Sequence, residues 1–435
     1  MLLVDLQIAA RNLTRHTRRS LFLGGALAAV TGLLILLSAL TAGIEGAMME
    51  SATTLMTGDV NVGGFFKVTA GSAAPLVSDY PRVLEATRKA VPEIDYLVVR
   101  GRGWAKAVSE TGSMDLVLGG VEIDKEPGVK RVLQPIQGKL DDLLQPNTIL
   151  LFQGQAERLK VGVGDMLTLA APTERGVNNT ADVKVAVVVK NVGLLSGFSA
   201  FIPAGSLNRL YGISPTTTGA IHLYLKDRRA SDTVAVRLRA LFKEQGWRVM
   251  EPDPQPYYMK LFLTVPASDW TGQQLDITTW ADELGNFKQI IFGLKALTFL
   301  LVFLLMVVVI IGILNTMAIA IRERTREIGT LRAIGMQRRK VLWLFVLEMG
   351  LLGTLGCALG AVLATLVAGG LNLARIRVPA AIEIFLSQEH LHFQLEPAAA
   401  VAAVVVLSLV TVLASVWPAV RAARLRPVTA MHHIG

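Results

Sequence analysis

The sequence contains a single cysteine, Cys357, and lacks the motifs of a chain that hydrolyses ATP. With one cysteine no internal disulfide can form, so an exported domain must be held together by its hydrophobic core. No GxxxxGK[ST] loop is present to supply the glycines and the lysine that hold nucleotide phosphates. We therefore expect no cofactor in this chain, and we expect any ATP and Mg²⁺ to be bound by a partner chain. Cys357 lies in an apolar segment, where we expect it to be a packing residue.

Signatures of catalytic and metal sites are also missing. The sequence has no HExxH or Cys/His spacing for a metal and no GxSxG motif for a nucleophilic serine. The histidines are scattered, and we expect them to be surface residues: His16, His222, His390, His392, His432 and His433. We expect no catalytic residue, no metal site and no enzyme activity in this chain.

Charged residues are scarce, at 18% of the chain against 52% hydrophobic residues. Soluble domains contain about 25% charged residues, so this composition indicates a membrane protein. A membrane-spanning helix needs about 20 apolar residues. Segments of at least that length are Leu21–Leu40, Ile290–Ile321, Val341–Val367 and Ala398–Trp417. Residues 44–288, between the first two segments, have the composition of an ordinary globular domain.

The net charge of +9 could suggest a nucleic-acid partner, but the excess lies beside the apolar segments. These basic residues are Arg11, Arg15, Arg18, Arg19, Arg322, Arg324, Arg326, Arg332, Arg338, Arg339, Lys340, Arg421, Arg424 and Arg426. By the positive-inside rule the three flanks are cytoplasmic, which places both termini inside and the large domain outside. We therefore expect the lipid bilayer, and no nucleic acid, as a partner.

The predicted fold class is a membrane protein with four transmembrane helices and a large α+β extracytoplasmic domain between the first two. Apolar runs and alternation predict strands at Asp59–Val68, Leu97–Val108, Met114–Gly119, Thr148–Phe152, Met166–Leu169, Val183–Val192, Ala220–Leu225 and Trp247–Met250. Helices are predicted at Pro81–Ala90, Gln155–Leu159 and Ser231–Gln245. The cluster Pro252, Pro254 and Pro256 predicts an extended linker or a subdomain edge.

The expected order is an N-terminal interfacial amphipathic helix (1–19), transmembrane helix 1 with a stalk (20–57), the extracytoplasmic domain (58–279), a stalk with transmembrane helix 2 (280–321), a charged cytoplasmic helix (322–340), transmembrane helix 3 (341–372), a short extracytoplasmic loop (373–396), transmembrane helix 4 (397–418) and a cytoplasmic tail (419–435). The alternative for residues 1–19 is a solvated terminus. A cleaved signal peptide is the alternative for the first apolar segment, although about 20 residues exceed the usual length of its apolar region.

Two stripes of small residues stand out within the apolar segments. Gly24, Ala28 and Gly32 follow four-residue spacing in the first segment, and Gly356 and Gly360 do so in the third. Such spacing allows close packing of helices in lipid, within or between chains, although glycine is also common in membrane helices in general.

Asn315 and Glu348 are intramembrane polar residues. We expect Glu348 to pair with Arg322 or Arg324 or to reach the interface, and a proton relay is the alternative for a carboxyl group at this depth.

The stretch NTMAIAIRERTREIGTLRAIGMQRRKVLWLFVLE (315–348) resembles the signature of the FtsX-like permeases, the membrane subunits of mechanotransmission-type ABC systems. The segments AARNLTRHTRRS (9–20) and WPAVRAARLRPVTAM (417–431) are also similar to this family. In the large domain, LGGVEID (118–124) and LKVGVGDMLTL (159–169) resemble the lipoprotein-releasing (LolC/LolE-like) branch. The MacB-like branch shares this type of outer domain but usually has a fused N-terminal ATPase, which this sequence lacks.

The resemblance implies two copies of a cytoplasmic ABC ATPase, and a second permease chain that is identical or related. It places the protein in the bacterial cytoplasmic (inner) membrane. It also makes residues 322–340 the coupling helix, with working positions Arg322, Arg324, Glu327, Ile328, Leu331, Arg332, Ile334 and Gly335. We expect Ile328, Leu331 and Ile334 to form one apolar edge that enters a groove of the ATPase. The alternative is that this loop is only a positively charged anchor, with Gly335 a helix C-cap.

The implied function is a permease subunit that extracts or exports a lipoprotein, a lipid or another amphiphile. One alternative is a transducer that regulates an extracytoplasmic partner such as a cell-wall hydrolase, and another is a membrane-anchored sensor without an ATPase.

Overall fold

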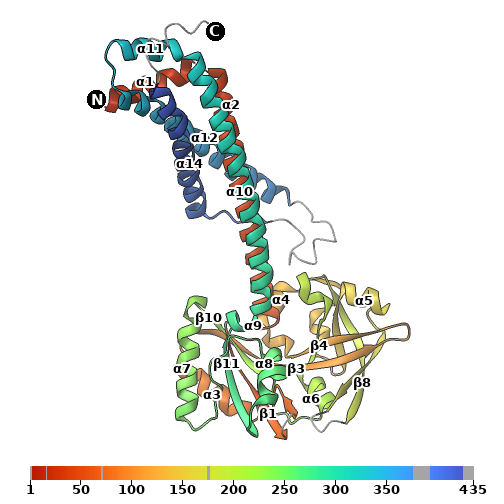
Figure 1. Ribbon diagram of the computed structural model, residues 1–435. Coiled ribbons are helices and arrows are strands. Elements are labelled where there is room, and N and C mark those ends of the chain that lie inside the picture. Colours follow the sequence, from red (N-terminus) through yellow and green to blue (C-terminus); the bar gives the residue numbers. More distant parts are fainter. Residues whose placement is uncertain (1, 16, 70–71, 174–176, 376–391, 425–435) are drawn as a thin grey trace. The chain divides into compact units, whose positions relative to one another are not determined.

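The computed structural model describes residues 2–15, 17–69, 72–173, 177–375 and 392–424 (Figure 1). The expected outer loop (373–396) and C-terminal tail (419–435) lie largely outside the described residues, as do His16, His390, Arg426, His432 and His433. The chain divides into two compact units. We call residues 1–45, 291–377 and 390–435 the helical unit, and residues 46–290 the inserted domain.

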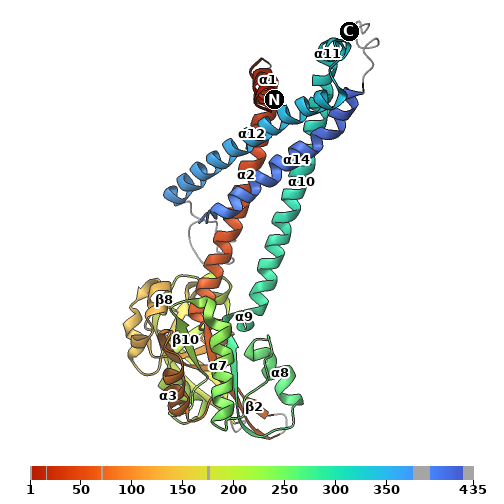
Figure 2. The same ribbon diagram turned by 90° about the vertical axis from the view of Figure 1, so that its left-hand side faces the viewer.

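The helical unit is built from long helices. Its elements are α1 (Leu2–Arg15), α2 (Thr17–Leu55), α10 (Gly285–Glu323), α11 (Thr325–Ala333), α12 (Arg338–Ala374) and α14 (Pro397–Ala423), of which α2 and α10 also contribute residues to the inserted domain. Within the described residues, four helices are long and apolar enough to cross a membrane: Ser20–Leu55, Phe287–Glu323, Arg338–Ala374 and Pro397–Ala423. Helices α12 and α14 pack against each other along their length (Figure 2).

The inserted domain combines one mixed sheet with short helices. Its strands are β1 (Val60–Thr69), β2 (Ser72–Ala74), β3 (Ile94–Val108), β4 (Ser113–Val121), β5 (Pro135–Gly138), β6 (Thr148–Phe152), β7 (Met166–Pro172), β8 (Asn178–Val189), β9 (Ser199–Pro203), β10 (Ala220–Leu225) and β11 (Gly272–Thr279). Its α-helices are α3 (Tyr80–Ala90), α4 (Pro127–Val132), α5 (Gln153–Leu159), α6 (Ala204–Tyr211), α7 (Ser231–Glu244), α8 (Tyr257–Ala267) and α9 (Trp280–Glu283). These elements and the four apolar helices confirm the expected fold class.

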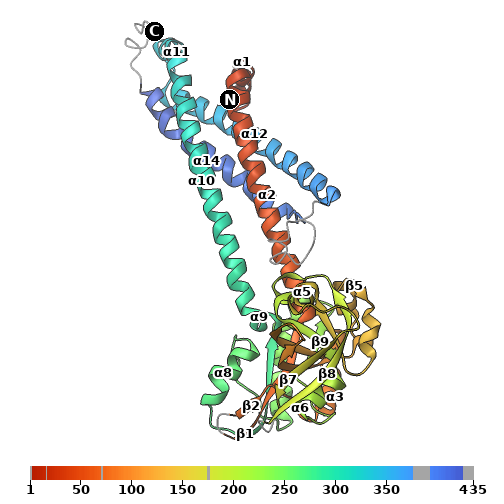
Figure 3. The same ribbon diagram turned by 90° about the vertical axis from the view of Figure 1, so that its right-hand side faces the viewer.

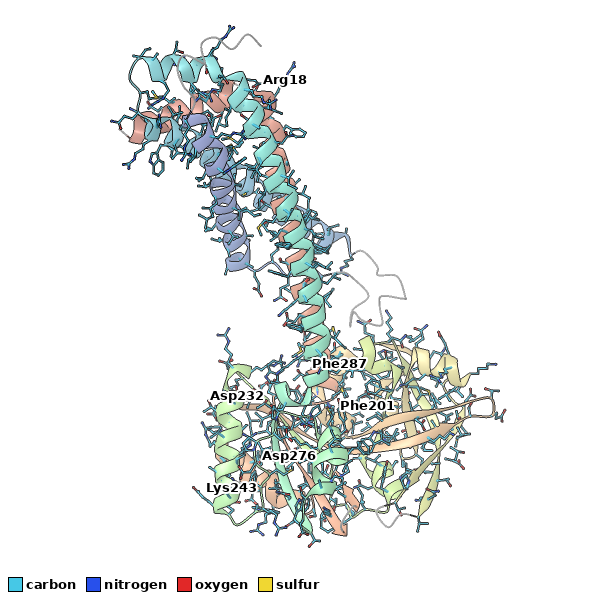
Figure 4. All side chains as sticks on the ribbon, viewed as in Figure 1. Arg18, Phe201, Asp232, Lys243, Asp276 and Phe287 are labelled. Atoms are coloured by element: carbon cyan, nitrogen blue, oxygen red, sulfur yellow. The ribbon has the colours of Figure 1, made fainter. Side chains whose placement is uncertain are left out.

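Strand β3 joins the two halves of the sheet, whose order is β11-β1-β10-β3-β4-β9-β6-β8-β5. The first half of β3 pairs antiparallel with β10, and its second half pairs with β4 and β7. Helices α3 and α7 pack together beside β1, β10 and β11 (Figure 2). Figure 4 labels Asp232 and Lys243 near the two ends of α7 and Asp276 among the interior side chains.

Hydrophobic patterning explains why these segments form these elements. Strands β6 and β10 are buried at every residue, as expected for largely apolar segments inside a sheet. Helix α7 buries Val234, Leu238 and Phe242 against β1, β10 and β11, at the spacing of one helical face. A second cluster packs Phe201 of β9 with Phe287 at the start of α10; both are labelled in Figure 4.

The structure confirms some of the secondary-structure predictions and contradicts others. The strands at Thr148–Phe152 and Ala220–Leu225 are confirmed. Helix α2 continues without a break to Leu55, close to the end of the segment 20–57 that was expected to form transmembrane helix 1 with a stalk. The strand predicted at Trp247–Met250 is wrong, because only Val249 forms an isolated bridge, to Leu275. Sequence reasoning also missed β9, β11 and α8. Pro256 precedes the first residue of α8, so the proline cluster leads into a helix.

Candidate functional site

The charged segment between the second and third apolar helices contains a short helix and two turns. Helix α10 ends at Glu323, α11 covers Thr325–Ala333, and α12 begins at Arg338. The expected single helix over 322–340 is therefore wrong, because a turn at Gly335 separates α11 from α12. Gly335 has φ +104°, in the left-handed region that glycine adopts with little strain at a helix C-terminus.

Arg324 lies at the junction of α10 and α11 and connects them to α12. Its Nη1 donates to Glu348 Oε2 at 3.0 Å, and its Nε donates to Glu327 Oε2 at 3.2 Å. The guanidinium also lies 5.6 Å from the centre of the Phe345 ring. The Glu348 side chain is 4% exposed, so its charge is compensated inside the protein. Of the partners expected for Glu348, the structure shows Arg324.

Ile328 anchors α11 to the rest of the helical unit. Its side chain is 4% exposed and belongs to a buried cluster with Val341 and Phe345 of α12 and Ala422 of α14. A helix of nine residues is marginal on its own, so this contact and the Arg324 network hold α11 in place. Phe345 and the α14 alanines were not predicted, although Val341, Phe345 and Glu348 share one face of α12 by spacing.

Ile334 faces away from this cluster and is 85% exposed. The expected apolar edge of Ile328, Leu331 and Ile334 is therefore wrong for Ile328, which is buried within the chain. Ile334 lies on the surface, and its contact with an ATPase stays a prediction. Arg322 and Glu327 are exposed and Arg332 is half-buried, with its Nη1 donating to the Met336 carbonyl at 3.3 Å. Further exposed basic residues follow at Arg338, Arg339 and Lys340.

The structure brings the two stripes of small residues together. A Cβ atom at Gly360 would lie 2.3 Å from the Ala28 carbonyl oxygen, and one at Gly356 would lie 2.9 Å from the Gly24 carbonyl oxygen. At Gly32 it would lie 3.3 Å from the Gly360 carbonyl oxygen. Helices α2 and α12 thus meet backbone to backbone within one chain, as small residues permit.

Asn315 is exposed on α10 and is not part of the Arg324 network.

Comparison with known proteins identifies the segment that contains this site. Residues 299–427 match the family described as FtsX-like permease C-terminal. This range includes α11, α12, α14 and the whole Arg324 network. Residues 299–427 are an FtsX-like permease domain.

The similar proteins match different lengths of this chain. The pyoverdine export ATP-binding/permease protein PvdT of Pseudomonas entomophila (strain L48) is 39% identical over 121 residues, which are 28% of this chain and 16% of PvdT. The lipoprotein-releasing system transmembrane protein LolC of Haemophilus influenzae (strain ATCC 51907 / DSM 11121 / KW20 / Rd) is 24% identical over 306 residues, which are 68% of this chain and 67% of LolC. The match to PvdT thus spans less than a fifth of that protein.

A solved structure also resembles the chain. The periplasmic region of MacB from Actinobacillus actinomycetemcomitans has a TM-score of 0.32 and 13% identity, covering 54% of this chain and 92% of that structure.

Proposed function

We propose that this FtsX-like chain is the permease subunit of an ABC transporter, driven by two copies of a separate cytoplasmic ATPase and paired with a second permease chain. Its work is done at the outer face of the bacterial cytoplasmic membrane, on a lipoprotein, a lipid or another amphiphile. The observation that carries the proposal is the junction at Arg324, where an exposed helix end is joined to two membrane-length helices by buried contacts.

In this proposal the working positions fall into two groups. The first group forms the surface that the ATPase contacts: Arg322, Ile334, Gly335 and the exposed parts of Glu327 and Arg332. Leu331, proposed from sequence, belongs to the same group. Arg324 and Ile328 transmit the movement of α11 instead of touching the ATPase. Because Arg324 pairs with Glu348 of α12 and Ile328 packs on α12 and α14, a displacement of α11 moves these helices with it.

The distribution of charge supports the proposed orientation. Arg338, Arg339 and Lys340 are exposed at the start of α12, and the sequences of the two terminal flanks are also rich in basic residues. Positively charged flanks remain cytoplasmic, which puts the inserted domain on the opposite side of the membrane.

The proposed cargo is supported by the composition of the helices and by the relatives. Glu348 is buried and paired, and the membrane-length helices are otherwise largely apolar in their central parts, which suits work at the membrane surface better than a hydrophilic pore. The relative that matches two thirds of its own length is named for lipoprotein release, and PvdT is named for pyoverdine export. Regulation of an extracytoplasmic partner, such as a cell-wall hydrolase, is the competing function.

The docking surface can be tested by copurification. The tagged full chain is expressed in a bacterium with its ATPase, purified in nanodiscs, and assayed for bound ATPase subunits and ATP hydrolysis. We expect Ile334→Asp to reduce the bound ATPase by about tenfold, since a carboxylate would be buried in an apolar contact. Leu373→Asp is the matched control, because Leu373 is 86% exposed at the other end of α12. Equal ATPase recovery from both variants would refute the docking surface.

The nature of the work requires a different experiment. Crosslinking of the inserted domain in intact cells, followed by mass spectrometry, identifies what the domain holds during turnover. Acylated or lipidic adducts support extraction or export. Adducts that contain only a soluble hydrolase would favour the regulatory function.

A further inference from the structure

The inserted domain contains a cavity of about 270 Å³ whose lining is mainly apolar and aromatic. It is bordered by β2, β3, α8, the C-terminal end of β7 and the segment after α6, and Figure 3 shows α8 beside β1 and β2. Four aromatic side chains line it: Phe66, Trp104, Tyr211 and Phe262. Small-molecule sites are typically concave and apolar with a few polar groups, and this cavity has that character.

Helix α8 is fixed in place as one wall of the cavity. Lys260, on its buried face, has no exposed surface and pairs with Asp276 of β11, with both carboxylate oxygens 3.0 Å from its Nζ. At the other end of the helix, Lys67 donates to the carbonyl oxygens of Val265 (3.0 Å) and Ser268 (2.5 Å). These buried cations are used entirely to hold α8 against the sheet, so the wall is a built feature of the domain.

The outward face of α8 nevertheless presents large apolar side chains. Phe262 is 69% exposed and lines the cavity, with its ring centre 6.3 Å from that of Trp104. Leu263 is 61% exposed but does not line the cavity. An exposed phenylalanine at the mouth of an apolar cavity is costly in water unless something covers it.

Arg102 supplies a positive charge to the lining. Its side chain is 8% exposed, its guanidinium stacks at 3.8 Å from the centre of the Tyr257 ring, and its Nη2 lies 3.9 Å from Glu283 Oε1. Within the described residues the guanidinium donates no hydrogen bond. The Tyr211 hydroxyl, by contrast, is fully engaged with the backbone of Trp104, and burial raises the pKa of Tyr211 to about 12, so it remains neutral. A largely buried guanidinium in the lining of a cavity favours an anionic or hydrogen-bond-accepting group on the ligand.

We propose that this cavity binds one hydrocarbon chain of an amphiphile, with an anionic or hydrogen-bond-accepting group placed near Arg102. A volume of ~270 Å³ corresponds to about nine water-sized groups, which is enough for one chain segment but not for a whole diacyl lipid. The proposal rests on the proposed function, in which the cargo is an amphiphile. It adds a specific contact site for that cargo in the inserted domain.

The test uses the full chain in nanodiscs and a ten-carbon fatty acid that carries a diazirine. After illumination, the labelled peptides are identified by mass spectrometry and quantified against the label on α14, which reports incorporation into the bilayer. We expect label on the peptides that contain Trp104 and Phe262. We expect Phe262→Asp to reduce this label by about tenfold, because a carboxylate at the cavity mouth opposes an apolar chain. Leu263→Asp, a neighbouring residue of similar exposure outside the lining, is expected to keep the label.

The contribution of Arg102 is tested with the matching diazirine-bearing hydrocarbon that has no carboxyl group. Arg102→Gln is expected to weaken labelling by the fatty acid and to leave labelling by the hydrocarbon unchanged. Competition by an unlabelled phospholipid or by an unlabelled N-acylated dipeptide then distinguishes a lipid from an acylated peptide as the natural source of the chain.

Label confined to the membrane-length helices, or equal label in Phe262→Asp and Leu263→Asp, would overturn the proposal. The two proposals can fail separately. If the cavity label is lost while the ATPase copurifies normally, only the cavity site is refuted. If the cavity label is intact and Ile334→Asp leaves ATPase binding unchanged, only the coupling proposal is refuted.

Discussion

Arg100 and Glu126 form a buried bidentate ion pair, with Nε–Oε1 at 2.7 Å and Nη2–Oε2 at 2.6 Å. The same guanidinium donates to the carbonyl oxygens of Leu55 (2.8 Å) and Thr54 (2.9 Å) at the C-terminal end of α2. These carbonyls have no partner within the helix, so Arg100 satisfies them and interacts favourably with the negative end of the helix dipole. Arg100 therefore joins the C-terminal end of α2 to β3.

We expect Glu126→Gln to destabilise the inserted domain by about 3–5 kcal/mol, because it leaves Arg100 buried without its counter-charge. Backbone hydrogen exchange should accelerate in residues 50–57, because Arg100 hydrogen-bonds to the carbonyl oxygens of Thr54 and Leu55 in this segment. Glu93→Gln is the control, since the Glu93–Arg237 pair lies on the surface and such pairs contribute about 0–1 kcal/mol. Similar effects of the two substitutions on chemical unfolding of the full chain would contradict the role of Arg100.

The contact of α2 with α12 predicts that a large residue at Gly360 separates these helices. A side chain there meets the backbone of Ala28, whereas one at Gly369 of the same helix meets nothing within 4 Å. We expect Gly360→Leu to cost about 1–3 kcal/mol more than Gly369→Leu, which has the same change in helix propensity. Cys357, the single cysteine and fully buried, should become reactive to maleimide only in Gly360→Leu. Unchanged protection of Cys357 in both variants would argue against tight packing at Gly360.

Residues governed by hydrophobic periodicity or by a costly charge were predictable from sequence. The membrane-length helices are long apolar runs, and strands β6 and β10 are largely apolar. A carboxylate at Glu348 required a nearby cation. Strand β11 was missed because its polar residues are satisfied by distant partners. Asp276, for example, pairs with Lys260 of α8, and no local sequence pattern predicts that pair.

Side-chain burial in short polar segments could not be read from spacing. Ile328 and Ile334 are equally apolar, but the turn at Gly335 and the packing of α14 decide that the first is buried and the second is exposed. The expectation that the histidines lie on the surface is wrong for His222, which is 1% exposed in the middle of β10. Its Nδ1 is within hydrogen-bonding distance of Asn61 Oδ1 on β1, a partner that only the strand pairing reveals.

His222 predicts a loss of stability at acidic pH. Burial, together with the nearby charges of Arg100 and Arg102, holds the pKa of His222 well below its usual 6.5 in the folded domain. Above pH 6.5 the ring is neutral in both states, whereas below it the unfolded chain takes up a proton that the folded domain does not. Stability therefore falls as the pH decreases from 6.5, by up to about 1.4 kcal/mol per pH unit.

The measurement is urea unfolding of the full chain, followed by tryptophan fluorescence at pH 7.5 and pH 5.5. We expect His222→Gln to be less stable than the unsubstituted protein at the higher pH but to lose less stability on acidification. His392→Gln, at an exposed histidine of the helical unit, should leave the pH dependence unchanged. An identical loss in all three proteins would show that other groups cause it.

The exposed face of α10 predicts the contact with a second permease chain. The buried residues Val309, Ile313 and Met317 lie on one side of this helix, and the opposite side carries an exposed stripe at Leu304, Val308, Ile311, Asn315 and Ile319. Within the described residues the Asn315 side chain makes no hydrogen bond. An asparagine on a membrane helix gains about 0.6–2 kcal/mol from a hydrogen bond to another helix, so a second copy of α10 is the partner that we expect at this stripe.

Cysteine crosslinking tests this contact directly, because replacement of Cys357 by alanine leaves a chain without cysteines. In that background Asn315→Cys and Val308→Cys should form disulfide-linked dimers in membranes upon oxidation. Phe303→Cys is the control, since Phe303 is also exposed but lies about 120° around the helix from Asn315. Asn315→Leu should weaken the dimer in detergent, because it removes the hydrogen bond and keeps the apolar surface. Crosslinking that is equal at all three positions, or strongest at Phe303, would place the second chain on another face of α10.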